Sequence, residues 1–166
     1  MALVLKRWQD SASETSQVVL PHESNPLGYI LGGTVMHMID ITGALACHRH
    51  TNSLALTAGV DGLDFIHPIK VGDIIILKSR VNATFRTSLE VEVEVFSEGI
   101  TSGERKLTSK AYLTFVSLDD EGNPKPVPPL LLESAEDEER SQQAHTRRDE
   151  RLARKKRARP PDASAP

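Results

Sequence analysis

The sequence predicts an α+β domain in which a mostly antiparallel sheet curls around one long apolar helix. Three observations lead to this class. A proline-free stretch from residue 34 to about residue 50 repeats apolar side chains every three or four positions, which is typical of a buried helix. Four later segments alternate apolar and other residues, as half-buried strands do, and short turns join them. A helix this apolar is best covered by a sheet that curves around it.

The elements are expected in the following order. Residues 1–15 are rich in serine and charge and are expected to form a loose lead-in to a short β-type run, Ser16–Pro21. Pro26 and three glycines then indicate a structured loop before the helix. The strands after the helix are expected at residues 54–65, 73–83, 88–96 and 106–118, with Glu90, Glu92 and Glu94 on a face exposed to water.

The domain is expected to span residues 16–132 and to end in a charged tail, residues 133–166. Helix-forming residues dominate the tail, with acidic side chains at its front and basic ones at its back, which suits the helix dipole. We expect a partly helical, solvated segment that becomes disordered in its last residues. Its basic end is also compatible with RNA, an anionic membrane or the phosphates of coenzyme A. No aromatic side chains are interleaved with the charges and acidic residues share the tail, so we expect no nucleic-acid partner.

Bulk composition indicates a soluble globular protein. The chain has 166 residues, of which 39% are hydrophobic and 26% charged, with a net charge of −3. Its single cysteine, Cys47, cannot form an intramolecular disulfide. The N-terminus lacks a signal-peptide core and no run reaches 18 apolar residues, so we expect a cytoplasmic location without a membrane span.

Asp40 stands in the middle of the predicted apolar helix. A carboxylate buried there without a partner would cost on the order of several kcal/mol of folding free energy. Asp40 is therefore expected to be paired, hydrogen-bonded or functional. Met36, Gly43 and Cys47 share its helix face, and none of them is a cation. The partner must come from elsewhere in the fold, from another subunit, from water or from a ligand. A structural pairing, with Arg49 or a strand backbone, is the alternative.

Gly32 and Gly33 stand immediately before the predicted helix. Free N–H groups at a helix start can polarise a carbonyl or stabilise an oxyanion, and a glycine lets a substrate approach closely. A plain tight turn is the alternative. Gly33 and Asp40 are separated by about 10.5 Å of helix at ~1.5 Å per residue, too far to act on one carbonyl within a single chain unless the carboxylate leans well back. This distance favours a site shared across a dimer.

Four motifs in order resemble one family. They are PHESNPLGYILGGTVMHMID, LTAGVDGLDFIHPIKVGD, FRTSLEVEVEVFSE and AYLTFVSLDDEGNPKPVPPL, which together cover about residues 14–132. The chain resembles the hotdog-fold acyl-CoA thioesterases of the YciA and brain acyl-CoA hydrolase type. The resemblance implies five antiparallel strands around a long central helix, hydrolysis of acyl-CoA to an acid and coenzyme A without a metal or redox cofactor, and a homo-oligomer, a dimer at least and a hexamer built as a trimer of dimers.

The resemblance also implies roles for individual residues. Asn25 matches the loop asparagine of the family and would orient the water or the carbonyl. Asp40 matches the helical carboxylate, a general base or a nucleophile supplied by the other subunit. The amide of Gly33 is the candidate for polarising the thioester oxygen. The segment Arg86, Thr87 and Ser88 resembles the family segment that touches the coenzyme A nucleotide, where an arginine suits a phosphate.

Other readings were weighed. His48 and His50 could hold a metal only with a third ligand, no G-x-S-x-G elbow is present, and Cys47 is more typical of a small buried apolar residue. A non-catalytic acyl-CoA binding or sensing module on the same fold is the main alternative function. A hotdog hydratase or dehydratase would need a histidine beside the carboxylate, for which His37 is the candidate.

Overall fold

The computed structural model describes residues 4–158, and contacts within the chain divide it into two compact units, residues 1–131 and 132–166. The elements in chain order are η1 (Trp8–Asp10), β1 (Ser13–Val18), η2 (Pro21–Glu23), α1 (Gly32–Thr51), β2 (Leu54–Phe65), β3 (Ile74–Thr84), β4 (Ser88–Glu98), β5 (Arg105–Leu118) and α2 (Ala135–Ala158).

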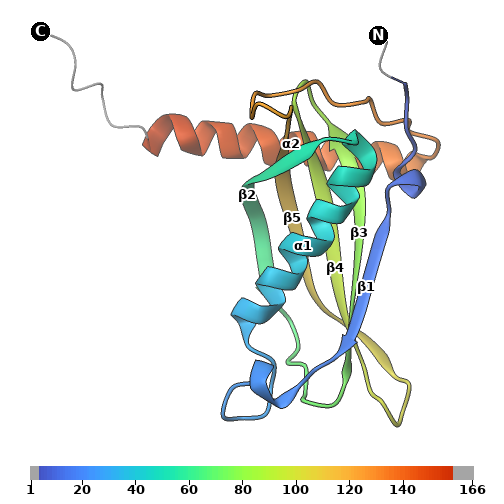
Figure 1. Cartoon of the computed structure of the whole chain (residues 1–166), viewed down its shortest axis with the longest axis vertical. Helices are drawn as coiled ribbons and strands as arrows, with labels where there is room; N and C mark the ends of the chain where they lie inside the picture. The colour runs from blue at the N-terminus through green and yellow to red at the C-terminus, as the bar shows by residue number, and fades with distance from the viewer. Residues whose placement is uncertain (1–3, 159–166) are drawn as a thin grey trace, which may run out of the picture. The chain divides into compact units, whose positions relative to one another are not determined.

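The first unit is a five-stranded antiparallel sheet with the order β1-β3-β4-β5-β2. The long helix α1 crosses one face of this sheet and contacts all five strands (Figure 1). The prediction of an α+β hotdog architecture, with an antiparallel sheet around a central helix, is therefore confirmed. Strands β1 and β2 form the two edges of the sheet, and β2 is the longer of them.

The core lies between α1 and the inner face of the sheet. Alternate residues of β4, namely Leu89, Val91, Val93 and Val95, are fully buried, as are Ile39 and Ala46 of the helix. Gly43 sits at a close contact between α1 and β5. A β-carbon added to Gly43 would lie 3.1 Å from Cε2 of Phe115, so the helix packs at a distance that a larger side chain would not permit without a shift of its neighbours.

Two element boundaries differ from the prediction. The helix α1 begins at Gly32 and ends at Thr51, where Asn52 adopts a left-handed conformation with φ 47° and donates its N–H to the carbonyl of His48. Strand β1 begins at Ser13, so residues 13–15 belong to the sheet and not to a loose lead-in. Their pairing with β3 outweighs a weak local pattern, because edge-strand register is decided by tertiary contacts.

The expected water-exposed row of glutamates is wrong for two of its three members. Glu90 and Glu92 are only 1% and 3% exposed. The Asn82 amide donates weakly to both of them, at 3.5 and 3.3 Å, and the Lys110 ammonium lies 3.6 Å from Glu92 and 2.8 Å from Glu94. Alternation shows which residues share a face, but it does not show whether that face is solvated.

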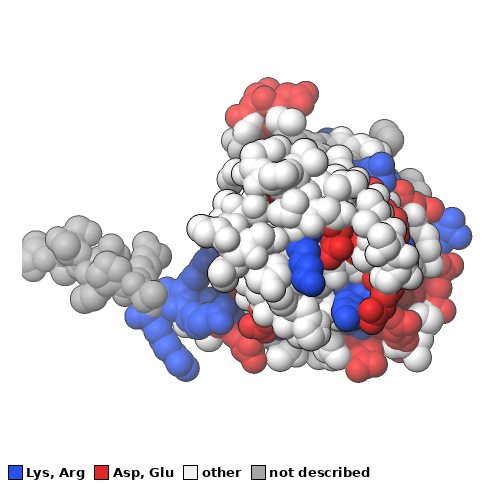
Figure 2. Space-filling view, turned by 90° about the horizontal axis from the view of Figure 1, so that it is seen from below, with Lys and Arg blue, Asp and Glu red and all other residues white. Residues whose placement is uncertain are grey.

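The second unit contains the charged helix α2. The hydroxyl of Ser134 accepts a hydrogen bond from the N–H of Asp137 and so caps the helix start. Acidic residues occupy the first turn, and Lys155, Lys156 and Arg157 the last, where blue side chains gather in Figure 2. The predicted disorder of the final residues falls on residues 159–166, outside the described part. Within residues 4–158, no helix combines the length and apolar character needed to cross a membrane.

His50 is a fully buried polar side chain near the end of α1. Its Nε2 donates to the carbonyl of Pro128 at 2.9 Å, whereas Nδ1 has no hydrogen-bonding partner among residues 4–158. Burial lowers the pKa of His50 below its ordinary value, because the imidazolium form would lose its hydration.

We expect this histidine to make the fold less stable in mild acid. Below about pH 6.5 the unfolded chain binds a proton at this position that the folded chain excludes, so the free energy of unfolding falls as the pH drops toward the lowered pKa. His50→Gln, which keeps a donor for Pro128, should show a smaller fall in thermal midpoint between pH 7.5 and 5.5. His22→Gln, at an exposed position, is the control. Equal falls in wild type and His50→Gln would contradict the assignment.

Candidate active site

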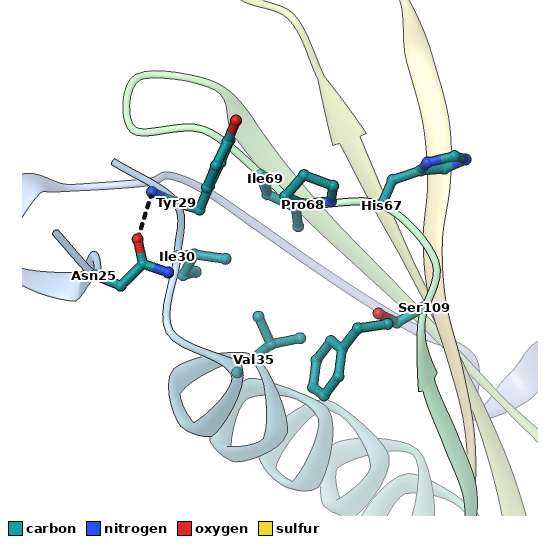
Figure 3. Close-up of a pocket in the computed structure, with 10 residues that line it drawn as sticks. Asn25, Tyr29, Ile30, Val35, His67, Pro68, Ile69 and Ser109 are labelled. Atoms are coloured by element: carbon teal, nitrogen blue, oxygen red, sulfur yellow. Dashed lines mark hydrogen bonds between the residues drawn. The ribbon is translucent and has the colours of Figure 1, made fainter. Parts of the chain in front are cut away.

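The loop before α1 folds around the side chain of Asn25. Its Oδ1 accepts hydrogen bonds from the N–H groups of Leu27 at 3.0 Å and Tyr29 at 3.2 Å, and its own N–H donates to the carbonyl of Tyr29. Because two donors meet Oδ1, the orientation of the amide is determined. Nδ2 points away from these bonds, on the side of Ile30 (Figure 3), and it has no hydrogen-bonding partner within residues 4–158.

The start of α1 presents unsatisfied N–H groups. Leu31 occupies the N-cap position without a side-chain cap, and the first backbone bond of the helix runs from Val35 to Leu31. In the described part of the chain, no acceptor bonds to the amides of Gly32 and Gly33. A β-carbon at Gly33 would meet nothing within 4 Å, so its backbone is open to a ligand.

A pocket of about 360 Å³ lies beside this helix start. Asn25 and Gly32 belong to its lining, but Gly33 and Asp40 do not. The complete lining consists of Asn25, Tyr29, Ile30, Gly32, Val35, Phe65, His67, Pro68, Ile69 and Ser109. It therefore combines one amide donor with a largely apolar wall.

Asp40 is half-buried and has a partner in the same chain. The hydroxyl of Thr57, on β2, donates to Oδ1 of Asp40 at 2.6 Å. Arg49, the alternative structural partner, instead donates to the carbonyl of Ala12 and to the hydroxyl of Ser13. Within residues 4–158, Oδ2 of Asp40 makes no hydrogen bond, so one carboxylate oxygen is held and the other is available.

Sequence reasoning missed Thr57. Nothing in the alternating run of β2 distinguishes it from its neighbours, because its importance comes from the packing of β2 beside α1. A search for a hydroxyl opposite the buried carboxylate could have proposed it only after the strand had been placed against the helix.

The segment Arg86, Thr87 and Ser88 forms the turn between β3 and β4. Its backbone carbonyls accept bonds from Val127, Ser117 and Phe85, respectively. Arg86 is exposed, and none of the three side chains makes a hydrogen bond within the described residues. The turn is at the upper end of the sheet in Figure 1 and the Asn25 loop is at the lower end, separated by the roughly 36 Å length of an 11-residue strand.

The structure thus brings Asn25 close to the helix start but leaves Asp40 and the Arg86 turn farther along the same chain. Asp40 follows Gly32 by eight residues, or about 12 Å of helix.

The other candidates carry no comparable site. Cys47 is buried, and its burial raises its pKa to about 12. Among residues 4–158, no cluster of three or more His, Cys, Asp or Glu side chains could hold a metal ion.

Comparisons with known proteins identify relatives along most of the chain. The family model of the thioesterase superfamily matches residues 27–104. The uncharacterized acyl-CoA thioester hydrolase YkhA of Bacillus subtilis is 36% identical over 138 residues, which cover 83% of this chain and 80% of YkhA. An apo-hexameric acyl-CoA thioesterase has a solved structure that is 38% identical, with a TM-score of 0.87 over 92% of this chain and 97% of the other.

A third relative is the acyl-CoA hydrolase of Staphylococcus aureus, solved with butyryl coenzyme A, coenzyme A and coenzyme A disulfide. It is 32% identical, with a TM-score of 0.86 over 93% of this chain and 94% of that chain. Variants of that enzyme with alanine at one asparagine, one aspartate or one threonine have also been solved. The asparagine precedes the aspartate by fifteen positions and the threonine follows it by seventeen, which are the spacings of Asn25, Asp40 and Thr57 here.

The loop geometry leads to a prediction about Asn25. Asn25→Ala removes the acceptor of two backbone bonds and should lower the local opening free energy of the loop by about 1–3 kcal/mol. Asn25→Asp keeps an acceptor oxygen and should leave the loop ordered. Hydrogen exchange at the amides of Leu27 and Tyr29 measures the difference. Equal protection in the two variants would show that the side chain does not organise the loop.

Proposed function

Because this chain belongs to the hotdog-fold thioesterase superfamily, we propose that it hydrolyses acyl-CoA thioesters to a free carboxylic acid and coenzyme A. The observation that carries the proposal is the Asp40 carboxylate, which has one oxygen held by Thr57 and the other available. Together with Asn25 it forms a set whose residue types and spacing recur in the S. aureus acyl-CoA hydrolase.

In this proposal Asp40 activates the attack on the thioester. As a general base it takes a proton from water while the water oxygen bonds to the carbonyl carbon. As a nucleophile its free oxygen bonds to that carbon directly, and water then hydrolyses the anhydride. Thr57 fixes the rotamer of the carboxylate through Oδ1, so that Oδ2 faces the reaction. The base or nucleophile is a side chain of the protein, and the chemistry asks for no metal or redox cofactor.

Amide donors would stabilise the charge that develops on the thioester oxygen. The N–H of Gly33 carries the positive end of the helix dipole, and Nδ2 of Asn25 is a donor with no partner within residues 4–158. Collapse of the tetrahedral intermediate breaks the C–S bond and releases the thiolate of coenzyme A. Because a thiol is far more acidic than an alcohol, the thiolate is a good leaving group and needs little help from an acid.

We propose that the complete site forms across a dimer joined through β2. This strand is a 12-residue sheet edge whose outer side pairs with no strand in the described part of the chain, and Leu54, Leu56 and Val60 on it are about half exposed. Such an edge favours pairing with a second copy. Met36, Ile41 and Leu45 add exposed apolar area on α1.

A two-fold axis between two subunits would bring together the site residues that lie far apart within one chain. Antiparallel pairing of two β2 strands reverses the second chain, so the lower end of one sheet lies beside the upper end of the other. The Asn25 loop and Gly33 of one subunit then approach Asp40 and the Arg86 turn of its partner. Arg86, with Thr87 and Ser88, would bind the phosphates of coenzyme A. The hexameric relative supports a hexamer for this chain, which we propose is a trimer of such dimers.

Substitutions at Asp40 and Thr57 test the chemistry. We expect Asp40→Asn to lower turnover by at least ~10²-fold, because the base or nucleophile is lost. Thr57→Val keeps the shape but removes a hydrogen bond to a charged group, and we expect a loss of about tenfold. Release of free thiol from short to long acyl-CoAs measures both, with Thr101→Val as a control in an exposed turn.

Two outcomes would contradict this scheme. A near-normal rate in Asp40→Asn would remove Asp40 from the chemistry. Saturable binding of acyl-CoA by the wild type without any thiol release would instead favour the non-catalytic binding module.

Mixed dimers test whether the site is shared. Neither Asn25→Ala nor Asp40→Ala should be active alone, but a dimer with one subunit of each kind retains one intact site. We therefore expect purified mixed dimers, selected with two affinity tags, to recover up to about half of the wild-type activity. Verified mixed dimers without activity would show that Asn25 and Asp40 act from the same chain.

A further inference from the structure

The pocket beside Asn25 has a largely apolar wall, with side-chain hydrogen-bonding groups only on Asn25, Tyr29, His67 and Ser109. None of its ten lining residues is Asp, Glu, Lys or Arg. Ile30, Val35 and Ile69 are buried, and the N–H of Ile30 donates to the carbonyl of Ile69 at 2.9 Å, so these backbone groups satisfy each other. An uncharged surface also covers much of the face in Figure 2. Along Ile30, Val35 and Ile69 the amides of a pantetheine arm would find no partners, whereas an acyl chain needs none.

The pocket has two distinct sides. Asn25 is on one side and Ser109 on the other, with Val35 between them in Figure 3. Phe65 is the register partner of Ser109 at the end of β2, and it therefore belongs to the side away from the Asn25 amide. A group that accepts a hydrogen bond from Nδ2 of Asn25 and extends along Val35 would end at Phe65.

The ring of Phe65 rests against the start of the helix. A β-carbon added to Gly32 would lie 3.4 Å from Cζ of Phe65 and 3.6 Å from Cε2, so the missing side chain of Gly32 is what leaves room for the ring. The same ring lines the pocket and is 52% exposed in the single chain. The ring therefore lies between the pocket and the start of α1, and it is not part of the buried core.

We propose that Phe65, held against Gly32, is the end wall of the acyl subsite and limits the substrate to short acyl chains. This inference rests on the proposed thioesterase function and names its substrate class. The pocket volume of about 360 Å³ lies at the small end of the range of roughly 300–1,000 Å³ for ligand pockets, and Phe65 lines the side of the pocket away from Asn25.

Acyl-chain profiles of Phe65 variants test the proposal. We expect the wild type to prefer short acyl-CoAs, measured as kcat/KM from thiol release over even chain lengths from two to sixteen carbons. Phe65→Ala opens the end wall and should raise kcat/KM for longer chains by about tenfold or more relative to the wild type, since one methylene in an apolar pocket changes selectivity by 10- to 200-fold. Phe65→Trp and Gly32→Ala fill the same space and should shift the preference to shorter chains.

Phe96→Ala is the matched control. Phe96 is a half-buried aromatic residue of β4 outside the pocket, and its truncation should leave the chain-length profile unchanged. The molar mass of each variant in solution, from light scattering, separates a change of selectivity from a change of assembly. In the double variant Gly32→Ala with Phe65→Ala, the added methyl group no longer meets a ring, so the shift toward short chains should disappear.

Three results would overturn the inference. An unchanged profile in Phe65→Ala would show that the ring does not bound the chain. An equal loss at every chain length would assign the ring to the common part of the substrate or to the fold. A wild type without turnover would refute the proposed hydrolysis. Binding constants for the same acyl-CoA series, measured by calorimetry, would then test the role of Phe65 separately. Equal chain-length selectivity in wild type and Phe65→Ala would count against that role.

Discussion

The tight contact between Gly43 of α1 and Phe115 of β5 sets how closely the helix lies on the sheet, and the candidate site depends on that distance. The 2.6 Å hydrogen bond from Thr57 to Asp40 joins β2, the strand beside β5, to the same helix. The same helix presents Gly32 and Gly33 at its start. One close-packed contact thereby determines where the carboxylate and the free N–H groups stand.

Two carboxylates in this chain show how the surroundings of a side chain suit it to a structural or to a catalytic role. Glu92 is 3% exposed and lies close to the Lys110 ammonium and the Asn82 amide, which suits a structural group. Asp40 is half-buried, accepts one hydroxyl hydrogen bond, and keeps an oxygen without a bond in the described part of the chain. A buried ion pair is held in place by its partner, whereas a carboxylate with one oxygen available can bind a water molecule or a carbonyl carbon.

The architecture could be predicted from the sequence because the signals for it are periodic. The helix and the inner face of β4 follow from spacing alone, and the four motifs identified the family. Other features depend on contacts between distant segments. Strand β1 begins at Ser13 because β3 pairs with it, and Glu90 and Glu92 are buried although their alternation is that of an exposed face. Thr57 and the orientation of the Asn25 amide required the strand and the loop to be placed in space.

The apolar outer edge of β2 makes the stability of the fold depend on assembly. In the proposed dimer, the free energy of joining two edges adds to the free energy of folding, so the apparent stability of the protein increases with its concentration. A dilute or newly made chain would instead present a long apolar strand edge, which is the structural template for aggregation. Substitutions that only weaken the interface would then reduce the amount of protein in a cell, even where every residue of the chemistry is intact.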